Sequence, residues 1–206
     1  MGQAQFNGHS MVGALRRVMV CSPRNAGWET ASSAGQWKTL GFNHEPNCNI
    51  AQTQHDGLRK ILDDAGAEVV TLPGSVSLSL DAVYTHDSSF PTDSGLILMN
   101  PGKRNRIGEA QSHREFCHEL GVPVFGEIRA PGTTEAGDMV WLDSKTLLIG
   151  HGYRTNVAGI RQMCEFLKPK MVEVLAAPLP HGAGPSAPNG NEEENQKCPA
   201  ISTASS

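Results

Sequence analysis

The sequence predicts an α/β fold made of repeated strand–helix–strand units. Apolar runs typical of strands alternate three times with stretches of helical periodicity. The joints that lead from a helix into the next strand are also alike, DAGAEV at 64–69 and ELGVPV at 119–124. Units repeated at a spacing of roughly 50–80 residues indicate an array or a propeller in which each unit covers its neighbour. A doubly wound sheet would explain the alternation too, but no glycine-rich dinucleotide loop follows the first strand.

The first unit is expected within residues 15–72. Its elements in order are a strand at 15–21, a long loop at 24–50, a helix at 50–65 and a strand at 67–72. The loop is rich in Gly, Asn and Trp and has no sustained period. The helix has apolar residues at helical spacing, and Gly66 is suited to end it.

The second and third units repeat this order. The expected elements are a strand at 95–100, a helix at 107–120 and a strand at 122–125, then a strand at 146–149, a helix at 157–167 and a strand at 172–176. Gly121 ends the second helix as Gly66 ends the first.

The composition changes at His181. Residues 182–195 read GAGPSAPNGNEEEN, and a Ser/Thr/Ala-rich end follows. Such a segment has too little apolar surface to offset the entropy lost on ordering. We therefore expect a partial domain at 1–181 and a disordered, low-complexity tail at 182–206.

Charge and cysteine usage exclude several classes of partner. The net charge is −4 without basic clusters, which argues against nucleic acid or an anionic membrane as a partner. No apolar run is long enough to span a membrane, and the N-terminus lacks the features of a signal peptide. The five cysteines are widely spaced and show no metal-ligand spacing. This pattern favours reduced thiols in a cytoplasmic protein and predicts no metal site.

Polar residues gather beside the predicted strands in three segments. They are residues 81–93, residues 100–109, and the stretch that runs from 132–138 to 150–156. Each segment lies at the edge of a unit, where a propeller would bring strand ends together. Carboxylates and arginines that converge there suit a small zwitterion carrying a cation and a carboxylate.

Four motifs within these segments resemble the guanidino-group-modifying superfamily, which includes arginine deiminase, dimethylarginine dimethylaminohydrolase (a dimethylargininase) and the amidinotransferases. The motifs are YTHDSSFPTDSGLIL at 84–98, NPGKRNRIGE at 100–109, PGTTEAGD at 131–138 and GHGYRTN at 150–156. The resemblance covers residues 14–181 and implies the pentein fold, an α/β propeller of which this chain represents about three of five units.

The resemblance also implies a reaction. In the superfamily a cysteine thiolate attacks the guanidino carbon to give a thiouronium intermediate, and a histidine transfers protons. The parent reaction is hydrolysis of a C–N bond or amidino transfer, with no metal or organic cofactor. The implied partner is a small guanidino compound such as arginine or a methylarginine.

Four residues match ligand-binding positions of the superfamily. Asp87 and Glu135 match the carboxylates that bind the guanidinium, and Arg154 matches a contact to the ligand's carboxylate. Arg106, with Arg104 as the alternative, resembles the arginine that helps to hold the ligand's other end.

Each of these positions has a simpler interpretation. Asp87 could cap a turn through the serines that follow it. Glu135 and Asp138 could be solvated loop acids, and Arg154 could pair with a surface carboxylate.

The tail departs from the superfamily pattern. In similar sequences the Leu-Pro-His element, here at 179–181, is followed by the catalytic histidine, by further units and by the nucleophilic cysteine. Cys198 has no strand before it, and His181 belongs to an element that precedes the catalytic histidine. We therefore expect a truncated, inactive member that keeps the binding residues and has no catalytic ones.

Two alternatives remain open at the level of sequence. One is a non-catalytic protein that binds guanidino ligands or regulates another protein. The other is an incomplete gene model, whose open sheet edge would promote self-association.

Overall fold

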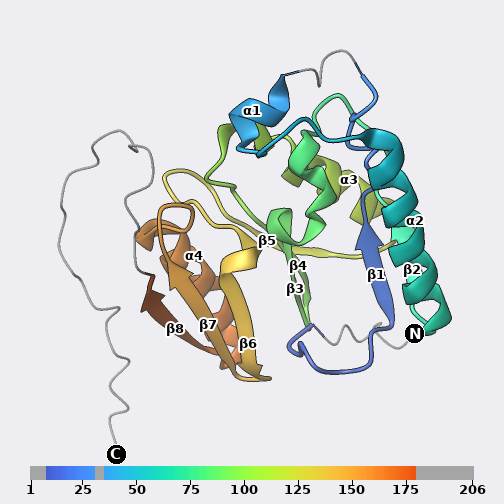
Figure 1. Ribbon diagram of the computed structural model, residues 1–206. Helices are drawn as coiled ribbons and strands as arrows, with labels where there is room; N and C mark the ends of the chain where they lie inside the picture. The colour runs from blue at the N-terminus through green and yellow to red at the C-terminus, as the bar shows by residue number, and fades with distance from the viewer. Residues whose placement is uncertain (1–7, 31–34, 180–206) are drawn as a thin grey trace, which may run out of the picture.

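Three small β-sheets, each joined to a helix, make up the computed structural model, which describes residues 8–30 and 35–179. Figure 1 shows the sheets side by side, from β1–β2 through β3–β5 to β6–β8. The predicted tail, with His181 and Cys198, lies outside the described residues.

The first unit contains the predicted strand–helix–strand order. It consists of β1 (Arg17–Val20), α1 (Gln36–Leu40), α2 (Cys48–Asp64) and β2 (Glu68–Thr71), with β1 and β2 parallel. The short helix α1 lies in the segment that the sequence predicts as a loop. Helix α2 begins two residues earlier than predicted, because the Asn47 side chain accepts a hydrogen bond from the Ile50 backbone N–H.

The other two units share one topology, in which an antiparallel hairpin is followed by a helix and a parallel strand. The second consists of β3 (Ser89–Thr92), β4 (Gly95–Leu98), α3 (Glu109–Glu119) and β5 (Val124–Glu127), and the third of β6 (Met139–Asp143), β7 (Thr146–His151), α4 (Val157–Leu167) and β8 (Glu173–Pro178). All six elements predicted for these units are confirmed.

The sequence pattern misses β3 and β6, the first strand of each hairpin. Strand β3 contains Pro91, which cannot donate a ladder hydrogen bond and therefore weakens the strand signal. The structure tolerates Pro91 because β3 is an edge strand that pairs only with β4.

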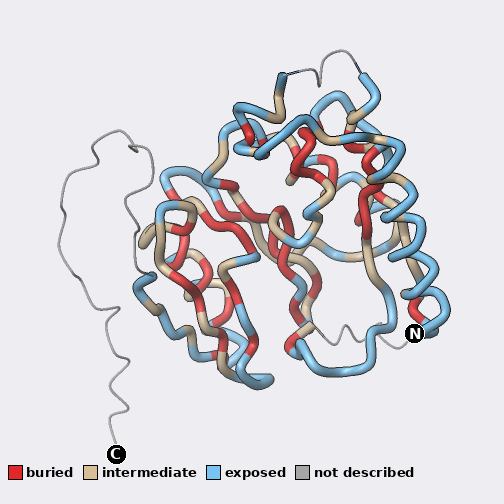
Figure 2. Tube along the Cα trace, viewed as in Figure 1, coloured by how far each residue is buried: buried red, intermediate tan, exposed pale blue. Residues whose placement is uncertain are grey.

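The apolar core lies mainly between the second and third units (Figure 2). Its largest members include Phe90, Ile97, Met139, Trp141 and Leu167. A smaller cluster around Leu72 and Leu78 supports the first unit. Helix α2 has no buried residue, so the apolar residues that predict it, such as Leu58 and Ile61, are exposed.

The α/β class is therefore confirmed, whereas closure into a propeller, of which about three of five units are expected here, is not shown. Each sheet within the described ranges is open. None of the helices in those ranges is long and apolar enough to cross a membrane.

Candidate functional site

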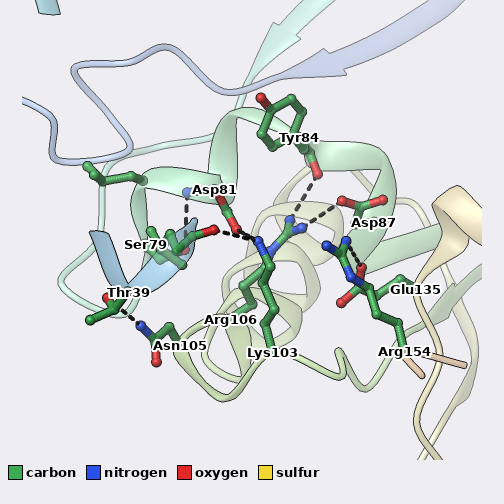
Figure 3. A network of polar contacts seen from close by, with 12 residues as sticks. Thr39, Ser79, Asp81, Tyr84, Asp87, Lys103, Asn105, Arg106, Glu135 and Arg154 are labelled. Atoms are coloured by element: carbon green, nitrogen blue, oxygen red, sulfur yellow. Dashed lines mark hydrogen bonds and ion pairs between the residues drawn. The ribbon is translucent and has the colours of Figure 1, made fainter. Parts of the chain in front are cut away.

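The loops that carry the four sequence motifs meet at one place in the fold (Figure 3). Two glycines show how close they come. A β-carbon added at Gly137 would lie 2.6 Å from Oδ1 of Asp87, and one added at Gly102 would lie 2.9 Å from Cα of Arg154. A β-carbon at Gly102 would collide with backbone, and one at Gly137 would force the Asp87 carboxylate to move, so the two glycines allow the loops to converge in this arrangement.

The Asp87 carboxylate is held by Arg106. Asp87 lies in the short helix η3 (Thr85–Ser88), and its Oδ2 accepts a hydrogen bond of 2.6 Å from Nη1 of Arg106. Nη2 of Arg106 also donates to the Tyr84 carbonyl at 3.1 Å. Arg106 is 1% exposed, so its guanidinium positions Asp87 from within the protein. Arg104, the alternative considered from the sequence, is exposed.

Glu109 is the buried centre of this network. Its Oε2 accepts hydrogen bonds from Nε and Nη2 of Arg106 at 2.9 and 2.7 Å and from the Ser88 hydroxyl at 2.7 Å. Its Oε1 accepts one from the Ser79 hydroxyl at 2.8 Å. Burial lowers the pKa of Arg106, but Glu109 and Asp87 outweigh that effect and raise it, so the guanidinium is charged.

Glu109 is not among the site residues expected from the sequence. The signal is present, because Arg106 and Glu109 are three residues apart at the start of a helix, where side chains of opposite charge meet. What the spacing does not show is that both residues are buried.

Glu135 and Arg154 are paired with each other. Nη1 of Arg154 donates to Oε2 of Glu135 at 2.9 Å. Glu135 is 2% exposed, so it is not a solvated loop acid, whereas the Arg154 side chain is 32% exposed. Burial lowers the pKa of Arg154, but Glu135 and, less strongly, Tyr153 outweigh that effect and raise it.

This pair is only partly satisfied. Oε1 of Glu135 and Nε of Arg154 are both buried without a hydrogen-bond partner. Unpaired polar atoms of this kind are costly, and they mark places where a ligand group can complete the bonding.

Asp138 anchors the same loop. The Thr155 hydroxyl donates to Oδ2 of Asp138 at 2.6 Å and accepts the backbone N–H of Glu135 at 3.2 Å. The loop that carries Glu135 is therefore tied to the loop that carries Arg154.

A cavity of about 370 Å³ lies beside this network. It is lined by Phe42, Tyr84, Asp81 and Lys103 among others. Tyr84 links it to the buried network, because this residue lines the cavity and its carbonyl accepts a hydrogen bond from Arg106.

The described thiols do not resemble an activated nucleophile. Burial raises the pKa of Cys21 to about 12 and that of Cys117 to about 11, and it also raises the pKa of Cys48. Cys164 packs against the apolar core. Nucleophilic cysteines need a lowered pKa and access to the ligand. Within residues 8–30 and 35–179, no His, Cys, Asp and Glu side chains gather into a potential metal site.

Comparison with known proteins connects this geometry to a family. Residues 77–183, about half of the chain, match the family model of arginine deiminase. The chain is 30% identical to an N(G),N(G)-dimethylarginine dimethylaminohydrolase of Pseudomonas aeruginosa over 60% of its own length and 48% of the relative's. It is 29% identical to the enzyme of that name in Streptomyces coelicolor, over 48% of this chain and 38% of the relative. In both cases the match spans less than half of the curated relative.

Solved structures of related enzymes have the same fold as this chain. A cysteine-to-serine mutant of the Pseudomonas aeruginosa enzyme, complexed with citrulline, superposes with a TM-score of 0.66 at 25% identity. The superposition covers 82% of this chain and 62% of that one. The N-terminal domain of ArgZ, a cyanobacterial arginine dihydrolase, has the same fold with a TM-score of 0.65 at 20% identity, over 80% of this chain and 58% of that one. The chain therefore belongs to the arginine deiminase family, within the guanidino-group-modifying pentein superfamily.

Proposed function

We propose that this site binds a small guanidino compound such as arginine or a methylarginine, with Asp87 and Glu135 as the guanidinium-binding groups. The observation that carries the proposal is the convergence of two carboxylates that are each held by an arginine. Oδ1 of Asp87 faces Gly137, and Oε1 of Glu135 has no hydrogen-bond partner. A planar guanidinium offers several N–H groups to such oxygens.

Binding requires an exchange at Glu135. The Arg154 guanidinium already occupies one oxygen of this carboxylate, so the incoming guanidinium takes its place. The released Arg154 then contacts the ligand's carboxylate, which is the role that the family resemblance implies. The citrulline complex of the Pseudomonas aeruginosa relative supports a ligand of this class.

The parent reaction of the proposal is attack of a cysteine on the guanidino carbon, followed by hydrolysis as in the dimethylarginine dimethylaminohydrolases. The raised pKa values of Cys21, Cys48 and Cys117 favour a second function, binding without turnover. Cys198 and His181 lie outside the described residues, and the product assay with Cys198→Ser tests the nucleophile directly.

Calorimetric titration with L-arginine and with asymmetric dimethylarginine tests the binding site. We expect micromolar affinity, a binding free energy of about −8 kcal/mol. Asp87→Asn and Glu135→Gln should each weaken binding at least tenfold, because each removes a charge-assisted bond to the guanidinium. Glu115→Gln, on an exposed face of α3, is the matched control and should bind like the parent chain. Unchanged affinity in the Asp87/Glu135 double variant would contradict the proposal.

A colorimetric assay for citrulline and for released ammonia or amine separates the two functions. Binding without product favours the non-catalytic one. Turnover that disappears in Cys198→Ser would instead show that the chain supplies its own nucleophile.

A further inference from the structure

The cavity beside the site contains a cation that the chain itself supplies. Nζ of Lys103 donates to Oδ2 of Asp81 at 2.8 Å and to the Leu40 carbonyl at 3.0 Å. The Asp81 side chain is 4% exposed, whereas the Lys103 side chain is 28% exposed and lines the cavity. An ammonium has three N–H donors, and these two bonds account for two of them.

The position of this ion pair relates it to the proposed guanidinium site. In the view of Figure 3 the Arg106 guanidinium lies between the Lys103–Asp81 pair and the Glu135–Arg154 pair. The Tyr84 carbonyl binds the same Arg106 that holds Asp87. A ligand anchored at Asp87 therefore has the cavity next to it for its other end.

We propose that Lys103 makes this cavity selective for guanidino carboxylates that carry no ammonium group. The inference rests on the proposed function and specifies the ligand class of the same site. Asp81 and the Leu40 carbonyl form a position suited to an ammonium, and Lys103 fills it. Lys103 lines the cavity as a cation whose third N–H is not used by these two bonds, and such a group favours a carboxylate.

An ammonium-bearing ligand meets two obstacles in this cavity. It must either lie beside the Lys103 ammonium, where like charges repel, or displace Lys103 from Asp81. Displacement gains little, because it exchanges one ammonium for another on the same buried carboxylate and has to solvate Lys103 elsewhere. A carboxylate avoids both obstacles and adds a contact to Lys103, alongside the one proposed for Arg154.

Three probes of similar length test the selectivity by calorimetry on the full chain. γ-Guanidinobutyrate carries a guanidinium and a carboxylate, agmatine carries a guanidinium and an ammonium, and L-arginine carries all three groups. We expect γ-guanidinobutyrate to bind at least tenfold more tightly than agmatine, with L-arginine between them. Agmatine binding as tightly as γ-guanidinobutyrate would overturn the inference while leaving the guanidinium site intact. If none of the three binds, both proposals fail.

Variants of Lys103 identify the residue responsible. Lys103→Met should weaken the binding of γ-guanidinobutyrate at least tenfold and remove the preference for it over agmatine. Lys103→Arg should keep that preference. Lys103→Met leaves the Asp81 carboxylate buried without its partner, which destabilises the folded protein. The double variant Asp81→Asn/Lys103→Met removes both charges and therefore avoids this loss of stability. A preference that persists in both Lys103→Met and the double variant would contradict the assignment to Lys103.

Discussion

Asp87 and Glu135 are both paired with an arginine, but the two pairs differ in how firmly they are held. Arg106 is 1% exposed and donates to Asp87, Glu109 and the Tyr84 carbonyl. The Arg154 side chain is 32% exposed and donates one hydrogen bond to Glu135, while its Nε has no partner.

The difference indicates a division of roles. A buried arginine with several charge-assisted bonds organises its surroundings and cannot leave without stranding two carboxylates. Arg154 is partly exposed and makes fewer such bonds, so a ligand guanidinium can take its place on the buried Glu135 without leaving that carboxylate unpaired. The site thus combines a fixed carboxylate at Asp87 with one at Glu135 whose partner is exchangeable.

The largest expected effect is that of Arg106→Lys on stability. A lysine keeps the charge but cannot make the forked bonds to Glu109 and Asp87. We expect the free energy of unfolding to fall by about 3 kcal/mol, measured by urea denaturation. A loss below about 1 kcal/mol would contradict a structural role for Arg106.

The next largest effect is a loss of stability at acidic pH, caused by the protonation of His113 near Arg106. His113 is fully buried, Nδ1 is 3.0 Å from the Ser89 hydroxyl, and burial followed by Arg106 lowers its pKa from 6.5 to about 4. The unfolded chain therefore binds a proton below pH 6.5 that the folded chain binds only near pH 4. The contribution of His113 to the free energy of unfolding is therefore complete above pH 6.5. It falls by up to about 3 kcal/mol as the pH drops to about 4.

Urea denaturation at several pH values between these limits measures this loss. His113→Phe removes the titrating group and should flatten the dependence. An equally steep dependence in that variant would assign the acid sensitivity to other groups.

A smaller effect is expected from Ser79→Ala. The hydroxyl donates to Oε1 of the buried Glu109 and accepts the Asp81 backbone N–H. Its removal should cost about 1 kcal/mol in the free energy of unfolding. If thermal denaturation shows no change, Glu109 does not depend on this bond.

The smallest effect on stability is expected from Arg154→Lys, the matched counterpart of Arg106→Lys. The hydrogen bond to Glu135 and the contact with Tyr153 are made at a partly exposed position, where a lysine can keep the charge close to Glu135. The free energy of unfolding should change by less than about 1 kcal/mol. A loss as large as that of Arg106→Lys would remove the distinction between the two pairs.

The sequence predicts helices α2, α3 and α4 and the strands other than β3 and β6, because their apolar patterns are clear. It misses β3 and β6, since strand pairing across the hairpin compensates for weak local signals such as Pro91. The segment 24–50 reads as a loop, although α1 within it supplies the Leu40 carbonyl that Lys103 contacts.

For the site, the motifs bring the right residues together but do not show how they are partnered. The burial of Arg106 and Glu109 and the pairing of Arg154 with Glu135 depend on how the short helices and loops pack, which spacing along the chain does not encode. The ion pair of Lys103 with Asp81 joins residues 22 positions apart and has no local sequence signal.

A crystal structure of the chain with L-arginine tests the central claim most directly. We predict that the ligand's guanidinium lies within hydrogen-bond distance of both Asp87 and Glu135, that Arg154 has left Glu135, and that Arg106 keeps its bonds to Asp87 and Glu109. A ligand bound elsewhere, with the Glu135–Arg154 pair intact, would contradict the account.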